Sequence, residues 1–274
     1  MNTRNGYADL IELLERLVRR ASEAILAIYG EKDFVVNIKA DASPLTAADL
    51  ASHHILDAGL KELNPELPVL SEENATHYTA AQRQGWTRYW LVDPLDGTKE
   101  FVKRNGEFTI NVALIEFGRP VLGIVHVPIE GTSYIGGVAG PAKRRDKAGI
   151  VNTLHTSDVA RQRAVRIVGS RSHAGGELEG FAAALGRHEF LAVGSALKFC
   201  LVAEGRADVY LRLKPTSEWD TAAGQAVLEA AGGAVTDLNG NPLRYNTRTT
   251  LINPSFLACG DRSRDYTSAA RKAA

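Results

Sequence analysis

Apolar residues recur at helical spacing over the first 30 residues of the chain. The positions on one face, with Glu and Arg between them, are Leu10, Ile11, Leu14, Leu17, Val18, Ala21, Ile25 and Ile28. This period predicts an amphipathic helix that ends near Gly30, and it lacks the basic segment and apolar core of a signal peptide. No apolar run is long enough to span a bilayer, so we expect no transmembrane segment.

Shorter apolar segments, separated by turn residues, follow this helix. They predict strands at 34–38, 68–70, 89–92, 108–115, 121–127 and 133–136, the last three of them antiparallel. A second helix is expected from Thr46 to Leu60. Thr46 and Asp49 have the spacing of a capping box at its start, with Asp in place of the usual Glu.

Strands and helices alternate in the second half. The predicted strands are 165–168, 190–193, 207–211 and 256–259, and the predicted helices are 177–185, 196–204 and 219–231. The fold class is therefore α+β, a mixed α/β arrangement. The Gly- and Lys-rich stretch 136–160 is the expected boundary between an N-terminal α+β lobe, residues 1–155, and a C-terminal α/β lobe, residues 156–274.

The charge balance argues against some classes of partner. Lysine plus arginine and aspartate plus glutamate both number 32, which gives no drive toward nucleic acid polymers or acidic membranes. The basic run Lys143-Arg144-Arg145 is interpreted as a solvated loop. Cys200 and Cys259 lie in apolar contexts and are too few for a disulfide framework, so we expect buried thiols and a reducing cytoplasm.

The segment Asp93-Pro94-Leu95-Asp96-Gly97-Thr98 follows the apolar run 89–92. Two carboxylates at a strand's end repel each other unless a cation lies between them. Their oxygens and an intervening backbone carbonyl suit Mg²⁺, and free amides at Gly97 and Thr98 suit a phosphate. Asp-Pro and Asp-Gly are also common turn dipeptides, so the segment alone fits a simple turn as well.

Three further acids stand where predicted strands or helices begin or end. Glu72 follows a short strand, Asp220 opens a helix, and Asp49 lies in the first turn of another. Helix capping alone would explain Asp49 and Asp220, and a solvated turn would explain Glu72. Their joint recurrence at such positions favours a binding site, because loops at element ends carry functional groups.

Four ordered segments resemble the lithium-sensitive, Mg²⁺-dependent phosphatases of the inositol monophosphatase superfamily. They are 43–49, Ser71-Glu72-Glu73, 90–98 and Glu218-Trp219-Asp220-Thr221-Ala222-Ala223-Gly224. They stand in the family's order, and the resemblance extends over nearly the whole chain. The resemblance implies a layered αβαβα sugar-phosphatase-like fold with two lobes, and inhibition by Li⁺.

Within the superfamily the chain is most similar to the bacterial 3′(2′),5′-bisphosphate nucleotidase (CysQ-like) branch. The similar segments are Lys99-Glu100-Phe101, 170–173 and 194–200. Two segments depart from the branch: Ala196 replaces a serine, and Leu213-Lys214 stands where the branch often has Phe-Gly. These departures concern substrate contacts and leave the metal acids unchanged.

The resemblance also implies roles for individual residues. Two or three Mg²⁺ ions would be held by Glu72, Asp93, Asp96, Asp220 and the Leu95 carbonyl. The catalytic residues would be Asp49, Thr98 and Glu72, with the Thr98 hydroxyl holding the attacking water. The substrate would contact Asp96, Gly97, Thr98, His173, Ser195, Lys198, Arg212 and Asp220. As alternatives, Lys198 is a surface lysine, Arg212 an edge-strand residue and His173 a loop histidine without a role.

The implied activity is hydrolysis of the 3′-phosphate of 3′-phosphoadenosine 5′-phosphate, with 3′-phosphoadenosine 5′-phosphosulfate as a second candidate substrate. The alternatives are an inositol monophosphatase or broad sugar-phosphate phosphatase and, from another class, a non-catalytic cation- or phosphate-binding module. The expected partner is a small nucleotide bisphosphate. We expect a cytoplasmic monomer or homodimer, with peripheral association with the inner membrane left open.

Overall fold

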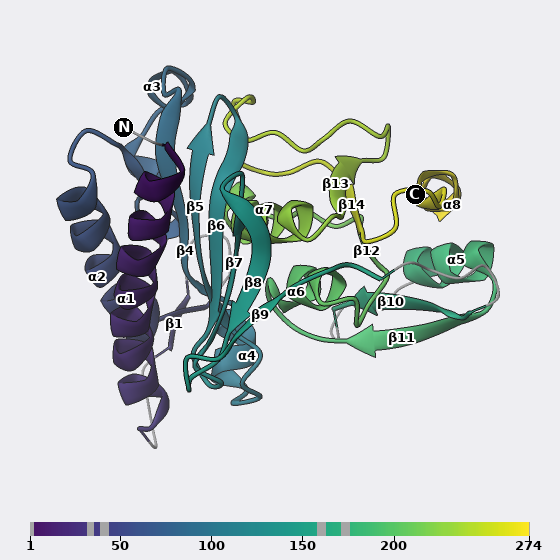
Figure 1. Cartoon of the computed structure of the whole chain (residues 1–274), viewed down its shortest axis with the longest axis horizontal. Helices are drawn as coiled ribbons and strands as arrows, with labels where there is room; N and C mark the ends of the chain where they lie inside the picture. Colours follow the sequence, from purple (N-terminus) through teal and green to yellow (C-terminus); the bar gives the residue numbers. More distant parts are fainter. Residues whose placement is uncertain (1–2, 32–35, 39–43, 158–162, 171–175, 274) are drawn as a thin grey trace.

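A computed structural model describes residues 3–31, 36–38, 44–157, 163–170 and 176–273 (Figure 1). Helices and sheets alternate in five layers across the molecule. From left to right in Figure 1 these are α1 with α2, a seven-stranded sheet, α6 with α7, a five-stranded sheet, and α5 with α8. This arrangement confirms the layered αβαβα fold expected from the sequence.

The first sheet has the strand order β3-β4-β5-β6-β7-β8-β9. Its strands are β3 (Val69–Ser71), β4 (Arg88–Asp96), β5 (Thr109–Glu116), β6 (Arg119–Val127), β7 (Thr132–Gly137), β8 (Gly140–Arg145) and β9 (Val151–Thr153). Helices α1 (Thr3–Tyr29) and α2 (Ala47–Leu63) cover one face, where Val18 and Ile25 join a buried cluster with Trp90. The shorter elements are β1 (Val36–Ile38), β2 (Pro44–Thr46), η1 (Glu72–His77), α3 (Ala80–Gln84) and α4 (Thr98–Val102).

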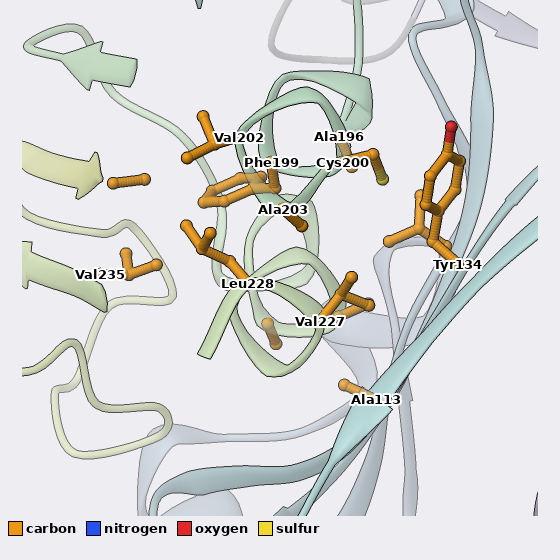
Figure 2. Packing of buried hydrophobic residues seen from close by; sticks show 14 of the residues in the cluster. Ala113, Tyr134, Ala196, Phe199, Cys200, Val202, Ala203, Val227, Leu228 and Val235 are labelled. Carbon is orange, nitrogen blue, oxygen red and sulfur yellow. The ribbon is translucent and has the colours of Figure 1, made fainter. Parts of the chain in front are cut away.

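The middle layer consists of α6 (Leu197–Ala203) and α7 (Ala222–Ala230). Their side chains form a buried cluster with Tyr134 of the first sheet and Val235 of the second (Figure 2). A Cβ atom at Gly224 would lie 2.6 Å from the Phe199 ring, so glycine is what allows the two helices to approach this closely.

The second sheet has the order β11-β10-β12-β14-β13. Its strands are β10 (Val165–Gly169), β11 (His188–Ala192), β12 (Val209–Arg212), β13 (Ala234–Asp237) and β14 (Phe256–Cys259), and α5 (Gly176–Leu185) and α8 (Tyr266–Ala273) lie outside it. Because β12 is the central strand, the edge-strand interpretation of Arg212 is wrong.

Two other sequence predictions differ from the structure. The run Lys143 to Arg145 is part of strand β8, where Arg144 pairs with Glu204 at 3.3 Å and Arg145 with Glu15 at 3.0 Å. Three consecutive charged residues do not show the alternation of apolar and polar residues that predicts a strand, so the sequence pattern suggested a loop. The expected helix 219–231 is divided into a short 3₁₀ turn, η2 (Glu218–Asp220), and α7.

The position of the lobe boundary at residue 155 stays a prediction. The chain passes from one sheet to the other between Thr153 and Val165. The start of the predicted strand 34–38 lies outside the described residues. No described helix is both long and apolar enough to cross a membrane.

Candidate metal and phosphate site

Asp93 and Asp96 lie at the C-terminal end of strand β4, in the first sheet. The pairing of β4 with β5 is irregular between these two residues. The backbone amide of Leu95 donates to Asp93 Oδ1 at 3.1 Å, and this turn fixes the carboxylate of a residue that is only 1% exposed. Strand β3 runs parallel to β4 with Ser71 opposite Val92, so Glu72 follows β3 beside Asp93.

Asp220 reaches the same place from the second half of the chain. It ends η2, where its Oδ2 accepts a hydrogen bond from the Ser217 amide at 2.9 Å. Asp93, Asp96 and Asp220 each offer one carboxylate oxygen, and these three atoms lie within 4.8 Å of one another. The structure therefore brings together three of the four acids named from the sequence, and the fourth, Glu72, begins η1 directly after β3.

These carboxylates repel one another. Burial raises the pKa of Asp93 well above its usual value, and the charges of Glu72, Asp96 and Asp220 raise it further. Burial, then Asp96 and Glu72, raise the pKa of Asp220 to about 8. Oxygen donors that repel each other at this spacing suit a hard divalent cation, so the donor set fits the metal expected from the sequence.

Asp49 and Thr98 meet beside this cluster. Thr98 Oγ1 donates to Asp49 Oδ1 at 3.1 Å and lies 3.3 Å from the Leu95 carbonyl oxygen. The other Asp49 oxygen accepts from the amide and hydroxyl of Thr46 at 2.7 and 2.6 Å, which confirms the predicted capping box. Asp49 therefore caps α2 with one oxygen and orients Thr98 with the other.

Gly97 allows the chain to turn from β4 into α4. Its φ of +92° is unfavourable for other residues, and an added Cβ would lie 3.1 Å from the Glu107 carbonyl oxygen. The binding of phosphate by the amides of Gly97 and Thr98 stays a prediction.

A cavity of about 420 Å³ opens beside the acids. Among its lining residues are Asp96, Gly97, Ser195, Lys198, Arg212 and Asp220. This cavity, called the active cavity below, thus places two of the acids that could hold a metal, Asp96 and Asp220, beside the residues expected to bind substrate. His173 lies outside the described residues.

Lys198 is buried in this wall, with 7% of its surface exposed, so the surface-lysine alternative is wrong. Its Nζ donates to the Ser195 carbonyl at 2.6 Å and lies 5.5 Å from the centre of the Tyr210 ring. Burial lowers the pKa of Lys198 to about 8, while Asp96 raises it. Arg212 donates to the carbonyls of Lys214 and Pro215, both at 3.0 Å, which orients its guanidinium group.

Two polar residues that the sequence analysis missed hold Asp96. Asn111 Nδ2 donates to Asp96 Oδ2 at 3.1 Å, and Thr109 Oγ1 lies 3.5 Å from the same oxygen. The amide of Ala196 donates to it at 2.6 Å. Polar residues inside the otherwise apolar predicted strand 108–115 were the available signal.

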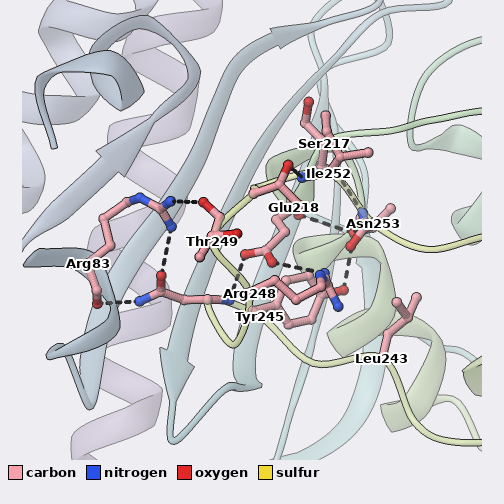
Figure 3. Close-up of polar contacts among 12 residues, drawn as sticks. Arg83, Ser217, Glu218, Leu243, Tyr245, Arg248, Thr249, Ile252 and Asn253 are labelled. Atoms are coloured by element: carbon pink, nitrogen blue, oxygen red, sulfur yellow. Dashed lines mark hydrogen bonds and ion pairs between the residues drawn. The ribbon is translucent and has the colours of Figure 1, made fainter. Parts of the chain in front are cut away.

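A second missed group anchors the turn that carries Asp220 (Figure 3). Glu218 is fully buried and accepts from the Asn246 amide at 2.7 Å and from Arg248 Nη2 at 3.0 Å. Arg83 Nη1 donates to Asn246 Oδ1 at 2.9 Å. Burial raises the pKa of Glu218 to about 7, although the hydrogen bond from the Asn246 backbone amide and the charges of Arg248 and Arg83 lower it. The network ties η2 to α3 beside the first sheet.

Many known proteins and solved structures are similar to this chain. The model of the inositol monophosphatase family matches residues 7–271. The 3'(2'),5'-bisphosphate nucleotidase CysQ of Escherichia coli (strain K12) is 47% identical over 248 residues, which are 90% of this chain and 98% of that protein.

Two solved structures are similar over most of their length. CysQ from Bacteroides thetaiotaomicron, a bacterial member of the inositol monophosphatase family, has a TM-score of 0.78 at 40% identity, covering 89% of this chain and 94% of that one. An inositol monophosphatase from Zymomonas mobilis has a TM-score of 0.77 at 26% identity, covering 97% and 98%.

Proposed function

Because the chain belongs to the inositol monophosphatase family, we propose that it hydrolyses the 3′-phosphate of 3′-phosphoadenosine 5′-phosphate to give AMP and phosphate. The bisphosphate nucleotidases that it resembles at 47% identity support this activity. Because these relatives are enzymes, they favour catalysis over the alternative of a non-catalytic cation- or phosphate-binding module. The corresponding 5′-phosphosulfate is a second candidate substrate.

The inositol monophosphatase family is metal-dependent, and we propose that this site binds two or three Mg²⁺ ions. Asp93, Asp96 and Asp220 would hold them, with Glu72 and the Leu95 carbonyl completing the set; the closeness of three carboxylate oxygens, within 4.8 Å, supports this assignment. When bound, Mg²⁺ supplies positive charge that lowers the pKa of an attacking water and stabilises the leaving oxygen.

Thr98 and Asp49 are the proposed proton-handling pair. The 3.1 Å hydrogen bond from Thr98 Oγ1 to Asp49 Oδ1 leaves the threonine oxygen free to accept a hydrogen bond from the attacking water. A proton from that water passes through Thr98 Oγ1 toward Asp49 Oδ1. Asp49 is 2% exposed, so bulk water has little access to this carboxylate, whereas Thr98 is partly exposed and can meet the attacking water.

The second phosphate is assigned to Ser195, Lys198 and Arg212. The observation that carries the nucleotide assignment is a buried lysine in the wall of the cavity that also contains Asp96 and Asp220. Burying a lysine is costly, and Asp96 offsets this cost only in part, because burial still lowers the pKa of Lys198 to about 8; a bound phosphate would add a further anion. We further propose a cytoplasmic monomer or homodimer, and the free thiols of Cys200 and Cys259 support the reducing location.

Side-by-side turnover of 3′-phosphoadenosine 5′-phosphate and inositol 1-phosphate tests the function. We expect faster release of phosphate from the nucleotide, and none in excess chelator. Preference for inositol 1-phosphate would favour the inositol monophosphatase alternative, and full activity in chelator would refute the metal assignment.

A matched pair of variants tests the second-phosphate pocket. Lys198→Met keeps much of the buried volume and removes the charge, so kcat/KM for the nucleotide should fall about tenfold or more while that for p-nitrophenyl phosphate changes little. Lys61→Met, at an exposed lysine of α2 paired with Asp57, is the control. Equal losses on both substrates in Lys198→Met would remove this residue from substrate selection.

A further inference from the structure

A second cavity, of about 310 Å³, lies where α7 meets β6 and β13. Arg119, Arg244 and Arg262 line it. They come from the start of β6, the loop after β13 and the segment after β14, so the fold brings together positions far apart in the sequence. Of the described residues that line this arginine cavity, none lines the active cavity.

The three arginines have no ion-pair partner in the described part of the chain. The one acidic residue in the cavity wall is Glu229, and its Oε1 accepts a hydrogen bond from Gln225 Nε2 at 2.8 Å. Desolvation raises the pKa of Glu229, while the Gln225 hydrogen bond and the charges of all three arginines lower it. Three positive charges thus surround one engaged carboxylate, and positive charge remains in excess.

The Gln225 side chain that donates to Glu229 is itself fixed by a hydrogen bond from Tyr245. The Tyr245 hydroxyl donates to Gln225 Oε1 at 2.6 Å and lies 3.2 Å from Thr221 Oγ1. With its oxygen engaged by Tyr245, the Gln225 amide presents its NH₂ group to Glu229 and keeps that carboxylate oriented. Thr221 lines the active cavity, so the same chain of side chains connects the two cavities.

We propose that Arg119, Arg244 and Arg262 form a second anion site, which binds a tetrahedral oxyanion, either phosphate or sulfate, free or as a monoester. Guanidinium groups suit this ligand because they donate paired hydrogen bonds to neighbouring oxygens and are weakly hydrated. Glu229 neutralises one of the three arginine charges, and a dianion would balance the remaining positive charge.

Calorimetric titration of the full chain with Mg²⁺ present tests the site, using sodium sulfate, sodium phosphate and AMP at constant ionic strength. The three ligands distinguish free anions from a phosphomonoester. The cavity variant carries Arg119→Gln, Arg244→Gln and Arg262→Gln. The control carries Arg20→Gln, Arg187→Gln and Arg206→Gln, at exposed positions outside the cavity.

We expect the cavity variant to lose one binding site for sulfate or to raise its Kd about tenfold or more, while the control stays within about twofold of the wild type. The single variant Arg244→Gln, expected to raise the Kd about threefold, serves if the triple variant does not fold. Wild-type stoichiometry and Kd in the cavity variants overturn the proposal, as does the lack of saturable sulfate and phosphate binding by the wild type. Turnover does not enter this test, so its outcome is independent of the proposed function.

Discussion

Replacing Asp93 by asparagine should stabilise the metal-free protein while removing its activity. Asp93 is 1% exposed and shares a cluster with Asp96 and Asp220, in which one oxygen from each lies within 4.8 Å of the others. Asparagine keeps an oxygen that can accept the Leu95 amide hydrogen bond, now 3.1 Å long. The substitution therefore removes a charge with little change of shape.

The size of the gain follows from Coulomb's law. Two unit charges at this separation repel by about 3.5 kcal/mol at an effective dielectric constant of about 20. Asp96 and Asp220 are partly open to solvent, which screens the repulsion. Proton uptake relieves more of it, because burial and the neighbouring carboxylates raise the pKa of Asp93 itself and raise that of Asp220 to about 8. We expect a net gain of about 2 kcal/mol, which corresponds to a rise in Tm of roughly 4 to 8 °C for a chain of this size.

Thermal unfolding in chelator and in excess Mg²⁺ measures this effect. In chelator, Asp93→Asn should unfold at a higher temperature than the wild type, whereas Mg²⁺ should raise the Tm of the wild type more than that of the variant. Phosphate release should fall by more than about 100-fold, beyond the usual effect of residues that only support a metal ligand. Asp9→Asn, at an exposed position of α1, is the control and should change neither quantity. A metal-free Tm below that of the wild type would refute the repulsion argument.

Three other substitutions test separate parts of the structure. Thr98→Val removes the donor to Asp49, so kcat should fall about 100-fold or more while the Mg²⁺-dependent rise in Tm is kept; an active variant would exclude Thr98 from proton transfer. Burial raises the pKa of Asp208, but hydrogen bonds from Arg166 and Arg163 outweigh it and hold that pKa well below 3.8. The ionised form therefore stabilises the fold above about pH 4 and the gain is lost as the pH falls further, so Asp208→Asn should cost about 2 kcal/mol in urea unfolding at pH 7 and less at pH 3. Gly224→Ala should lower the free energy of unfolding by about 1 to 3 kcal/mol, because its Cβ would lie 2.6 Å from the Phe199 ring; an unchanged urea midpoint would show that α6 can move away.

Local patterns predicted most of the elements. The helical period before Gly30 and the capping pair Thr46 and Asp49 place α1 and α2 within a few residues of their observed bounds, because each signal lies within one element. The convergence of Asp93, Asp96 and Asp220 was expected from the family motifs and from the position of each acid at an element's end. Their roles stay predictions, although their closeness in space agrees with them.

Other features depend on pairing between distant segments, which leaves no local pattern. The central place of β12 arises because β10 pairs with it in parallel and β14 in antiparallel fashion, so Arg212 gave no sign of its position. Lys143 to Arg145 form a strand because β7 and β9 lie on either side of them. The arginine cavity likewise leaves no local sequence pattern, since its arginines come from three separate segments.

Asp96 connects the two halves of the chain in the candidate site. Its Oδ2 is occupied by the Asn111 amide, at 3.1 Å, and by the Ala196 backbone amide, at 2.6 Å. One bond comes from the first sheet and the other from the start of α6, beside Ser195 and Lys198. Because both hydrogen bonds end on the same carboxylate, a displacement of Asp96 would also shift the segment proposed to contact the nucleotide. A backbone amide makes this link, so it does not depend on the side chain at position 196, where the family resemblance led us to expect a serine. Ala196 can therefore keep both parts of the site in register without a hydroxyl group.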